Sequence, residues 1–306
     1  MAESISVLAE YEERSQLDVF QDLSASGADV IRLSSSNGLG REPLSLRQSA
    51  TLLNDAFDLL AAAARAAERP QATYRGKMSS DVADYLDQVH PLPGYEGGFG
   101  LTLHSPVPAG FGQQDFGDDY AAPFSRLTTI KLAQALEFSR NAISKAVTEG
   151  SIEPFRQAVD FGVSANLCNS IAELAKQAHG INIELAWAEV RPANVPDSHF
   201  QFSSSSADTL QEVAKSFRFL EPSYDEQVIA QVVRLERDVE EFDGKAVIVS
   251  VRDGRPARMN VEFQQSAYDV VINAFRHHAS ISLDGDVHPV GRNLELRNPR
   301  NLIIVP

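Results

Sequence analysis

The last eighty residues of the chain constrain the fold most, because their hydrophobic period changes in a definite order. Three successive segments are rich in β-branched residues or alternate apolar with polar side chains, as half-buried strands do. These segments are residues 228–236, 245–251 and 257–263. Asp253 and Gly254 separate the second from the third, and this dipeptide predicts a tight hairpin because glycine accepts a positive φ.

A helix and two further strands follow. Ser266 can cap the helix by accepting a bond from a free backbone N–H. Four residues at helical spacing predict its buried stripe: Tyr268, Val271, Ile272 and Phe275. The period then returns to two, so residues 280–287 and 293–305 are expected to form the fourth and fifth strands, the last one broken at Asn298-Pro299.

Three strands, a helix and two strands is the order of the OB-fold, a five-stranded Greek-key barrel. The terminal module resembles that fold in order and spacing, over about a quarter of the chain. Other small β-barrels and α+β sheets share the same order. We predict an α+β protein with two domains: an N-terminal α+β domain over residues 1–221 and an OB-fold-like barrel with one helix over residues 222–306.

The first 221 residues mix helices with a few strands. The most regular helix is expected over Leu46–Glu68, with one buried stripe: Leu52, Leu53, Ala56, Phe57, Leu60, Ala63 and Ala64. Further helices are expected over residues 80–89, 125–147, 153–178 (broken near Gly162) and 206–219, with Ser80, Ser125 and Ser206 as caps. Strands are expected over residues 28–34, 101–107, 181–190 and 199–203. No Gly-rich turn joins a strand to a helix as a dinucleotide site requires.

Charge and composition restrict the possible partners and the compartment. The net charge is −15, of which residues 222–306 carry −3 and the first 221 residues −12. Such a field opposes binding of duplex DNA, where affinity comes from neutralised phosphates. No apolar run reaches the roughly 20 residues that span a bilayer, and the acidic N-terminus lacks the pattern of a secretory signal. A single cysteine, Cys168, excludes an internal disulfide, so we expect a cytoplasmic protein with no membrane contact.

Asp284, Asp286 and His288 are the best candidate metal ligands. Alternate residues of a strand project to one face, and two carboxylates with an imidazole can bind a divalent cation. The alternative is a solvated strand face that begins with an Asp284-Gly285 turn. No second carboxylate-rich segment completes the site.

Six arginines of the terminal module are candidates for contacts to single-stranded nucleic acid: Arg252, Arg255, Arg258, Arg292, Arg297 and Arg300. OB-folds bind single strands through cationic side chains combined with aromatic faces. Phe263 is the only aromatic residue that the first three strands supply, which weakens this interpretation.

Residues 108–123 form a Gly-rich connection that holds Phe111, Phe116 and Tyr120. At 16 residues it exceeds the roughly 12–15 at which structureless loops become uncommon in compact domains. We predict that these aromatics contact a partner, and the alternative is that they cover their own core. Tyr74–Lys77 is interpreted as a solvated connection, and Cys168 and Trp187 as core residues.

No motif of a nucleophile, a zinc enzyme or a phosphate loop is present. The leading hypothesis is a non-enzymatic binding or assembly protein, an adaptor subunit of a bacterial multiprotein complex such as a defence system, with a protein partner or self-association and no cofactor. One alternative is a single-stranded nucleic-acid binder, and another is a metal-dependent hydrolase with dispersed residues. The whole chain resembles bacterial proteins of unknown function, which implies no particular activity.

Overall fold

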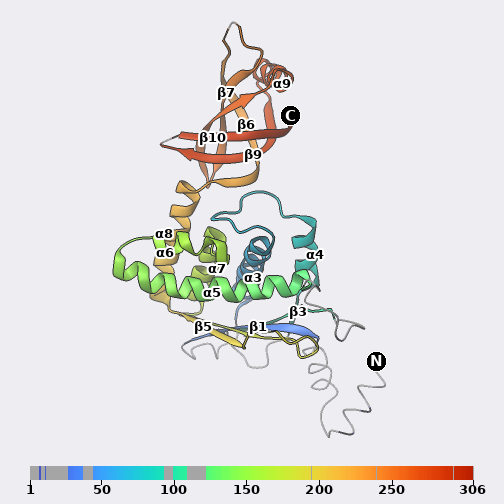
Figure 1. The fold of residues 1–306 in the computed structure, drawn as a ribbon, viewed down its shortest axis with the longest axis vertical. Coiled ribbons are helices and arrows are strands. Elements are labelled where there is room, and N and C mark those ends of the chain that lie inside the picture. Colours follow the sequence, from blue (N-terminus) through green and yellow to red (C-terminus); the bar gives the residue numbers. More distant parts are fainter. Residues whose placement is uncertain are drawn as a thin grey trace, which may run out of the picture. The chain divides into compact units, whose positions relative to one another are not determined.

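The computed structural model describes Val7, Tyr11 and residues 27–36, 44–92, 99–108, 122–193, 195–238, 240–291 and 293–305. These residues confirm the predicted α+β class: helices with an antiparallel sheet, then a closed five-stranded barrel with one helix (Figure 1). The chain divides into two compact units. Unit 1 comprises residues 1–70 and 79–213, and unit 2 comprises residues 71–78 and 214–306.

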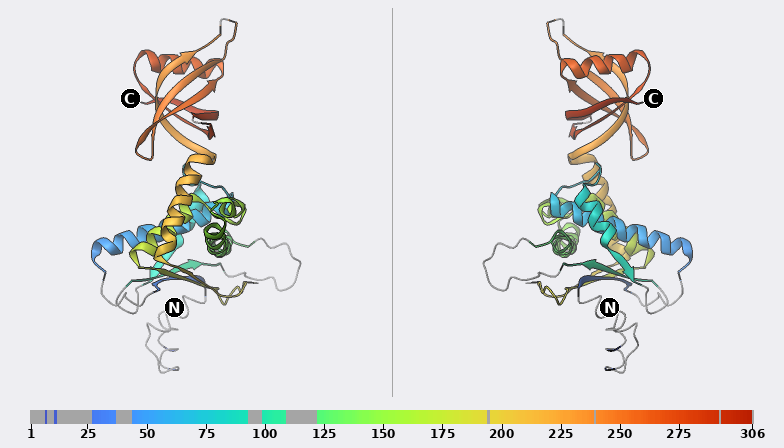
Figure 2. Two further views of the ribbon diagram at one scale, coloured as in Figure 1. Left: turned by 90° about the vertical axis from the view of Figure 1, so that its left-hand side faces the viewer. Right: turned by 90° about the vertical axis from the view of Figure 1, so that its right-hand side faces the viewer.

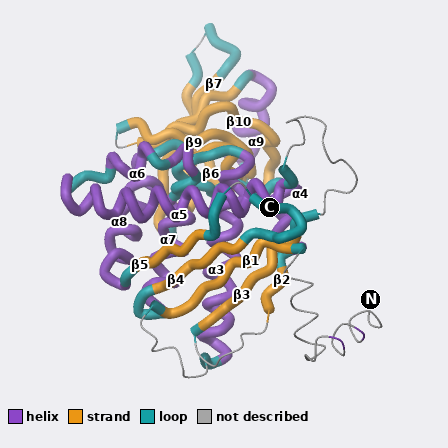
Figure 3. The backbone as a smooth tube through the Cα atoms, turned by 60° about the horizontal axis from the view of Figure 1, so that its bottom comes forward, coloured by secondary structure: helices purple, strands orange, loops and turns teal. Residues whose placement is uncertain are grey.

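The sheet of unit 1 has the strand order β2-β3-β1-β4-β5, and all its neighbours are antiparallel (Figure 3). Its strands are β1 (Ala28–Ser35), β2 (His90–Leu92), β3 (Gly100–Pro106), β4 (Ile181–Ala186) and β5 (Ser198–Phe202). Ile31 lies opposite Leu103 on one side and Leu185 on the other, and all three are buried. The alternation predicted for these segments therefore produces one apolar face.

Helices cover that face of the sheet (Figure 1). They are α3 (Leu46–Glu68), α4 (Ser80–Gln88), α5 (Phe124–Glu149), α6 (Glu153–Gln157), α7 (Ala165–Gln177) and α8 (Ser204–Leu220), with a short 3-10 helix at Val159–Phe161. α3 packs against both α5 and α7. Among the residues described, no helix is long and apolar enough to cross a membrane.

The buried stripe of α3 differs from the predicted one. Leu53 and Phe57 are 44% and 45% exposed, whereas Leu59 and the alanines from Ala61 to Ala64 are buried. The alanine-rich half is buried on every side, because small side chains let neighbouring helices approach closely. Val147 near the end of α5 is likewise exposed, whereas the smaller Ala142 and Ala146 are buried.

Three helices, α4, α5 and α8, begin earlier than their predicted caps imply. Ser79 and Ser203, rather than Ser80 and Ser206, accept bonds from the first turns of α4 and α8. In each of these serine runs the first serine caps and the next lies inside the helix. α5 begins after Pro123, without a side-chain cap, so Ser125 lies within its first turn.

Unit 2 contains the barrel, with strand order β10-β8-β7-β6-β9 closed between β9 and β10. Its strands are β6 (Ser223–Glu236), β7 (Gly244–Arg252), β8 (Arg255–Phe263), β9 (Ser280–Val290) and β10 (Asn293–Val305), and α9 (Gln265–Arg276) stands between β8 and β9. β10 is parallel to β8, and the other pairs are antiparallel. This arrangement is consistent with the OB-like module that the sequence predicts.

α9 packs on the barrel through a different set of residues than expected. Tyr268, Val271 and Ala274 are buried, whereas Phe275 is 39% exposed, so its predicted core role was wrong. The tyrosine hydroxyl donates to the carbonyl oxygen of Glu236 at 3.1 Å. Its ring leaves no space at Gly244, where a Cβ atom would lie 2.3 Å from the ring.

The start of α9 is fixed by a residue distant in sequence. Asp243 Oδ1 accepts a bond from the backbone N–H of Gln265 at 2.9 Å. Gln264 occupies the cap position and Ser266 lies inside the helix, so the predicted Ser266 cap was wrong. An acidic side chain at a helix N-terminus also interacts favourably with the helix dipole.

Residues 71–78 belong to unit 2 rather than to a solvated connection, and we call them the strap. Both guanidinium Nη atoms of Arg75 donate to the carboxylate of Asp253, at 2.8 and 3.3 Å. Gly76 lies against the backbone of Asp225, and a Cβ atom there would stand 2.0 Å from the carbonyl oxygen. The Tyr74–Lys77 stretch therefore packs on the barrel by charge and by close backbone approach.

Candidate functional site

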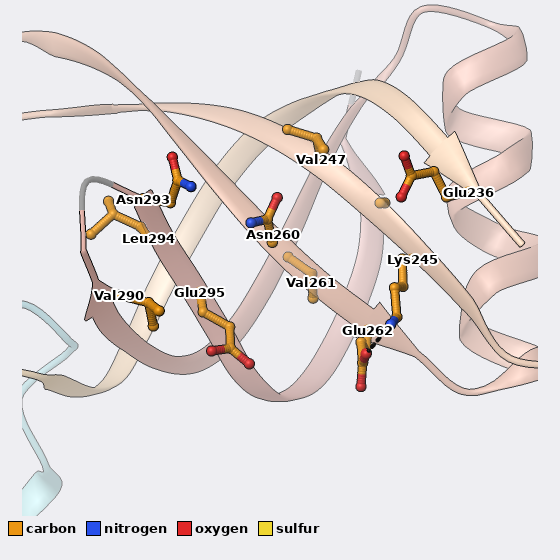
Figure 4. A pocket seen from close by; sticks show the side chains of 11 residues that line it. Glu236, Lys245, Val247, Asn260, Val261, Glu262, Val290, Asn293, Leu294 and Glu295 are labelled. Carbon is orange, nitrogen blue, oxygen red and sulfur yellow. Dashed lines mark ion pairs between the residues drawn. The ribbon is translucent and has the colours of Figure 1, made fainter.

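A pocket of about 370 Å³ opens on the outer face of the barrel (Figure 4). It is formed by β7, β8, the ends of β6 and β9, and the start of β10. Figure 4 shows Asn260 between Asn293, Leu294 and Glu295 on one side and Glu236, Lys245 and Glu262 on the other. In OB-folds the corresponding face of strands two and three, with its adjoining loops, is the ligand-binding surface.

The charged groups around this pocket are balanced. Each of its three glutamates is paired with one cation: Glu236 with Arg234, Glu262 with Lys245 at 2.9 Å, and Glu295 with Arg297 at 2.9 Å. The bond from Arg297 holds the pKa of the Glu295 carboxyl below its usual value. These pairs are solvent-exposed, so they exchange readily with other charged partners.

The rest of the lining is apolar or amide. Val247, Val290 and Leu294 supply apolar surface, and Asn260 and Asn293 supply both donors and acceptors. The pocket therefore combines apolar surface, amide groups that donate and accept hydrogen bonds, and charged groups of both signs.

A second, wider hollow of about 1170 Å³ adjoins the first and shares Glu236, Lys245 and Glu262 with it. The loop between β6 and β7 forms one wall, where Phe242 is 72% exposed. The described residues of the loop are acidic: Asp238, Glu240, Glu241 and Asp243 against Arg237.

Three of the six predicted nucleic-acid arginines are already paired with carboxylates. Arg252 forms a largely buried ion pair with Glu226 at 2.7 Å, Arg297 binds Glu295, and Arg300 binds Asp225. Arg255 and Arg258 are exposed on β8, and Arg292 lies outside the described residues. Burial lowers the pKa of the Arg252 guanidinium, and the adjacent Glu226 carboxylate opposes that change.

Two of the three predicted metal ligands, Asp284 and Asp286, accept hydrogen bonds from side chains of the neighbouring strand. Asp284 accepts a bond from Asn301 Nδ2, and Asp286 accepts one from Asn298 Nδ2, both at 2.8 Å. His288 lies edge-on to the ring of Tyr224. In the ranges described here, no three His, Cys, Asp or Glu side chains are grouped so that they could hold a metal ion.

The two asparagines explain why the carboxylates are placed there. Asn298 and Asn301 have positive φ, and the pairing of β9 with β10 shifts register around them. Asn tolerates this backbone better than most residues, and its amide bonds to the neighbouring strand at each bulge. The sequence showed the break at Asn298 but not the bonds that fix it.

The predicted partner-contacting residues Phe111, Phe116 and Tyr120 lie outside the described residues, so their role stays a prediction. Cys168 is fully buried, as the sequence analysis expects. Trp187 is not a mid-strand core residue. It follows β4, is half-buried, and donates from Nε1 to the carbonyl oxygen of Pro196 at 3.1 Å.

Unit 1 contains a buried polar cluster that the sequence analysis missed. Arg126 and Asp29 form an ion pair at 2.9 Å with both side chains almost fully buried. Asp29 also accepts bonds from the Thr129 hydroxyl and from the Ala188 backbone N–H. Burial, together with the nearby Asp29 charge, raises the pKa of the Tyr85 hydroxyl. An Asp in a strand and an Arg in a helix carry no sequence signal that they pair.

The two units differ strongly in charge. Unit 2 contains fourteen Lys or Arg and fourteen Asp or Glu residues, so the whole net charge of −15 lies on unit 1. Unit 2 differs in charge from residues 222–306 because it also contains Arg75 and Lys77 of the strap, Lys215 and Arg218 of α8, and Glu221. Unit 2 as a whole is therefore electrically neutral.

Comparison with protein-family models, with curated proteins and with solved structures found no match to this chain.

Proposed function

We propose that the chain is a non-enzymatic binding protein that holds an extended segment of a protein partner on the outer face of β7 and β8. The observation that carries the proposal is the 370 Å³ pocket on this face, with its balanced charges. Its apolar, amide and paired charged groups match the mixed chemistry of a polypeptide. A phosphate backbone requires an excess of positive charge instead.

The strand pairing of β8 also favours an extended ligand. β8 pairs with β10 only at Met259–Val261, so Glu262 and Phe263 have no strand partner on that side among the described strands. Both residues line the wider hollow. A partner segment can add to such an edge through backbone hydrogen bonds, with adjacent side chains in the pocket. We further propose that the protein serves as an adaptor subunit of a bacterial complex.

Site-specific photocrosslinking in the source cells tests the proposal. A benzophenone amino acid at Asn260 should give a discrete adduct with one protein, because Asn260 is exposed in the middle of the pocket lining. The same group at Val147, which is exposed on α5 of unit 1, is the matched control. A protein adduct that is equal at both positions, or absent at Asn260, contradicts the proposal.

A peptide made from the crosslinked region then provides a direct measurement. Isothermal titration should show binding to the wild-type chain and at least about tenfold weaker binding to Val247→Arg, since the arginine occupies the apolar side of the pocket. The control is Val251→Arg, on the same strand and outside the pocket lining, which should bind normally.

Single-stranded nucleic acid is the second candidate ligand. Arg258, Asn260 and Glu262 are exposed and lie two residues apart along β8. Their side chains therefore share one face of the strand. Fluorescence anisotropy with a labelled oligo(dT) of twenty nucleotides measures binding of single-stranded nucleic acid. Salt-dependent binding that Arg258→Glu abolishes, and that Arg276→Glu on α9 leaves unchanged, would favour nucleic acid over a protein partner.

A further inference from the structure

An uncovered apolar stripe lies on the N-terminal half of α3. Leu46 is 88% exposed, Leu53 44% and Phe57 45%, and Ala50 between them is exposed as well. Steps of four, three and four residues place these side chains on one face of the helix. Three large apolar residues in a row on one face differ from the scattered exposed apolar residues that any protein surface carries.

The two halves of α3 differ in their surroundings. The C-terminal half is buried from Leu59 to Ala64. The N-terminal half extends past the other helices of unit 1, as the blue helix in Figure 2 shows. The stripe therefore faces outward from unit 1 where the helix has fewest neighbours.

Two charged residues flank the stripe on the same side, Arg47 near its start and Asp58 near its end. At 100° per residue they lie about 20° apart around the helix axis, but eleven residues separate them along it, about 16 Å. They are too far apart to pair within one helix. Both are exposed, and neither forms an ion pair with any described residue.

A second copy of α3 in antiparallel orientation supplies an oppositely charged partner for both Arg47 and Asp58. When the two-fold axis passes near Leu53, Arg47 of each helix lies opposite Asp58 of the other, because antiparallel helices bring flanks of the same side together. The same register places Phe57 of one helix between Leu46 and Ala50 of the other, where the small alanine leaves space for the ring. A two-fold contact requires such a self-complementary surface.

We propose that this face of α3 binds the same face of a second copy of the chain, in an antiparallel helix pair with two Arg47–Asp58 ion pairs. The occupant is a second copy because the charge pattern complements itself. This inference is independent of the pocket on the barrel.

Sedimentation equilibrium of the full chain, from about 1 to 100 µM, tests the proposal. The wild-type chain should show a monomer–dimer equilibrium in this range, and Leu53→Glu should remain monomeric. Val147→Glu introduces the same charge at an exposed apolar position of α5, so it should dimerise like the wild type. Circular dichroism of each variant confirms that the fold is retained.

Charge reversal tests the orientation. Arg47→Glu and Asp58→Arg should each weaken the dimer by about tenfold, because each places like charges opposite one another twice. The double variant Arg47→Glu with Asp58→Arg restores opposite charges across the axis and should return to within about threefold of the wild type. A monomeric wild-type chain, or a double variant weaker than either single variant, overturns the proposal.

Discussion

Asp29 illustrates how unit 1 accommodates a charge inside its core. Its side chain is 1% exposed, yet Arg126, Thr129 and the Ala188 backbone all bond to it. A carboxylate without these partners would be strongly destabilised at such depth. The cluster joins β1, α5 and the segment after β4, three parts of the chain that are distant in sequence.

Removal of one partner should therefore be costly. We expect Arg126→Met to lower the free energy of unfolding by about 3–5 kcal/mol, because it leaves the Asp29 charge buried with fewer partners. The double variant Arg126→Met with Asp29→Asn should be more stable than Arg126→Met alone. Urea denaturation followed by circular dichroism measures both, and a double variant less stable than the single one would show that the pair is not the cause.

Asp55 on α3 should make stability depend on pH. Burial is the main reason that its pKa rises to about 6, helped by the nearby Glu173 and Asp58 charges and opposed by a bond from Gln177. The unfolded value is near 4. The folded protein thus holds the proton more tightly, so this residue reduces stability as the pH rises from about 4 to 6.

Asp55→Asn should remove this effect. We expect a gain of about 1 kcal/mol at pH 7.5, allowing for partial exposure of the group, and little gain at pH 4. Urea denaturation at several pH values measures it. Asp269→Asn, an exposed position on α9, is the control. A gain that does not vary with pH would contradict the assignment.

At the scale of the element, α9 shows which side of a helix carries the core. Val271 is fully buried and Phe275 is 39% exposed, although both are apolar and four residues apart. The buried residues of α9 are Tyr268, Val271 and Ala274, spaced three residues apart. Because one of them is a small alanine, the size of the side chains alone does not show which face of the helix packs on the barrel.

Two truncations distinguish these positions. Val271→Ala should cost about 1–3 kcal/mol, because it leaves a cavity between α9 and the barrel, and Phe275→Ala should cost less than about 1 kcal/mol. Thermal unfolding measures both. A larger loss of stability for Phe275→Ala than for Val271→Ala would show that Phe275 belongs to the core, as the sequence predicts.

Much of the element order follows from sequence period alone. The bounds of α3 match the expected Leu46–Glu68, and the order of five strands and one helix in the barrel matches as well. The period could not reveal contacts between distant residues. The Asp243 cap of α9, the Asn298 bond to Asp286 and the strap against Asp225 all depend on the folded chain. The pocket was missed for the same reason, because its lining residues come from all five strands of the barrel and meet only after the barrel closes.

At the scale of the whole molecule, charge is separated between the units. Unit 1 carries the full −15 and unit 2 is neutral. We therefore expect weak or no affinity for duplex DNA at physiological salt, because phosphate binding requires an excess of cations. Anisotropy with a labelled duplex measures it, and sub-micromolar binding that strengthens as salt falls would contradict this expectation.

Gly76 tests how closely the strap joins the barrel. In Gly76→Ala the new Cβ atom would lie 2.0 Å from the Asp225 carbonyl oxygen, and backbone cannot yield as a flexible side chain can. We expect a loss of about 1–3 kcal/mol in unfolding free energy. Gly27→Ala is the control, since nothing lies within 4 Å of its added atom. Equal melting temperatures for the two variants would mean that the strap shifts freely.

The strap also determines which stretches of the gene are needed to encode unit 2. A gene fragment for residues 214–306 encodes every strand of the barrel and α9, but it omits Arg75 and Gly76. The chain passes between the units three times, so no single cut releases unit 2 intact. Recombination that moved the barrel to another gene would need to carry two separate stretches, or the recipient would need to evolve a substitute for the missing one. A single contiguous gene fragment therefore cannot carry the barrel together with the strap that packs against it unless it also carries most of unit 1.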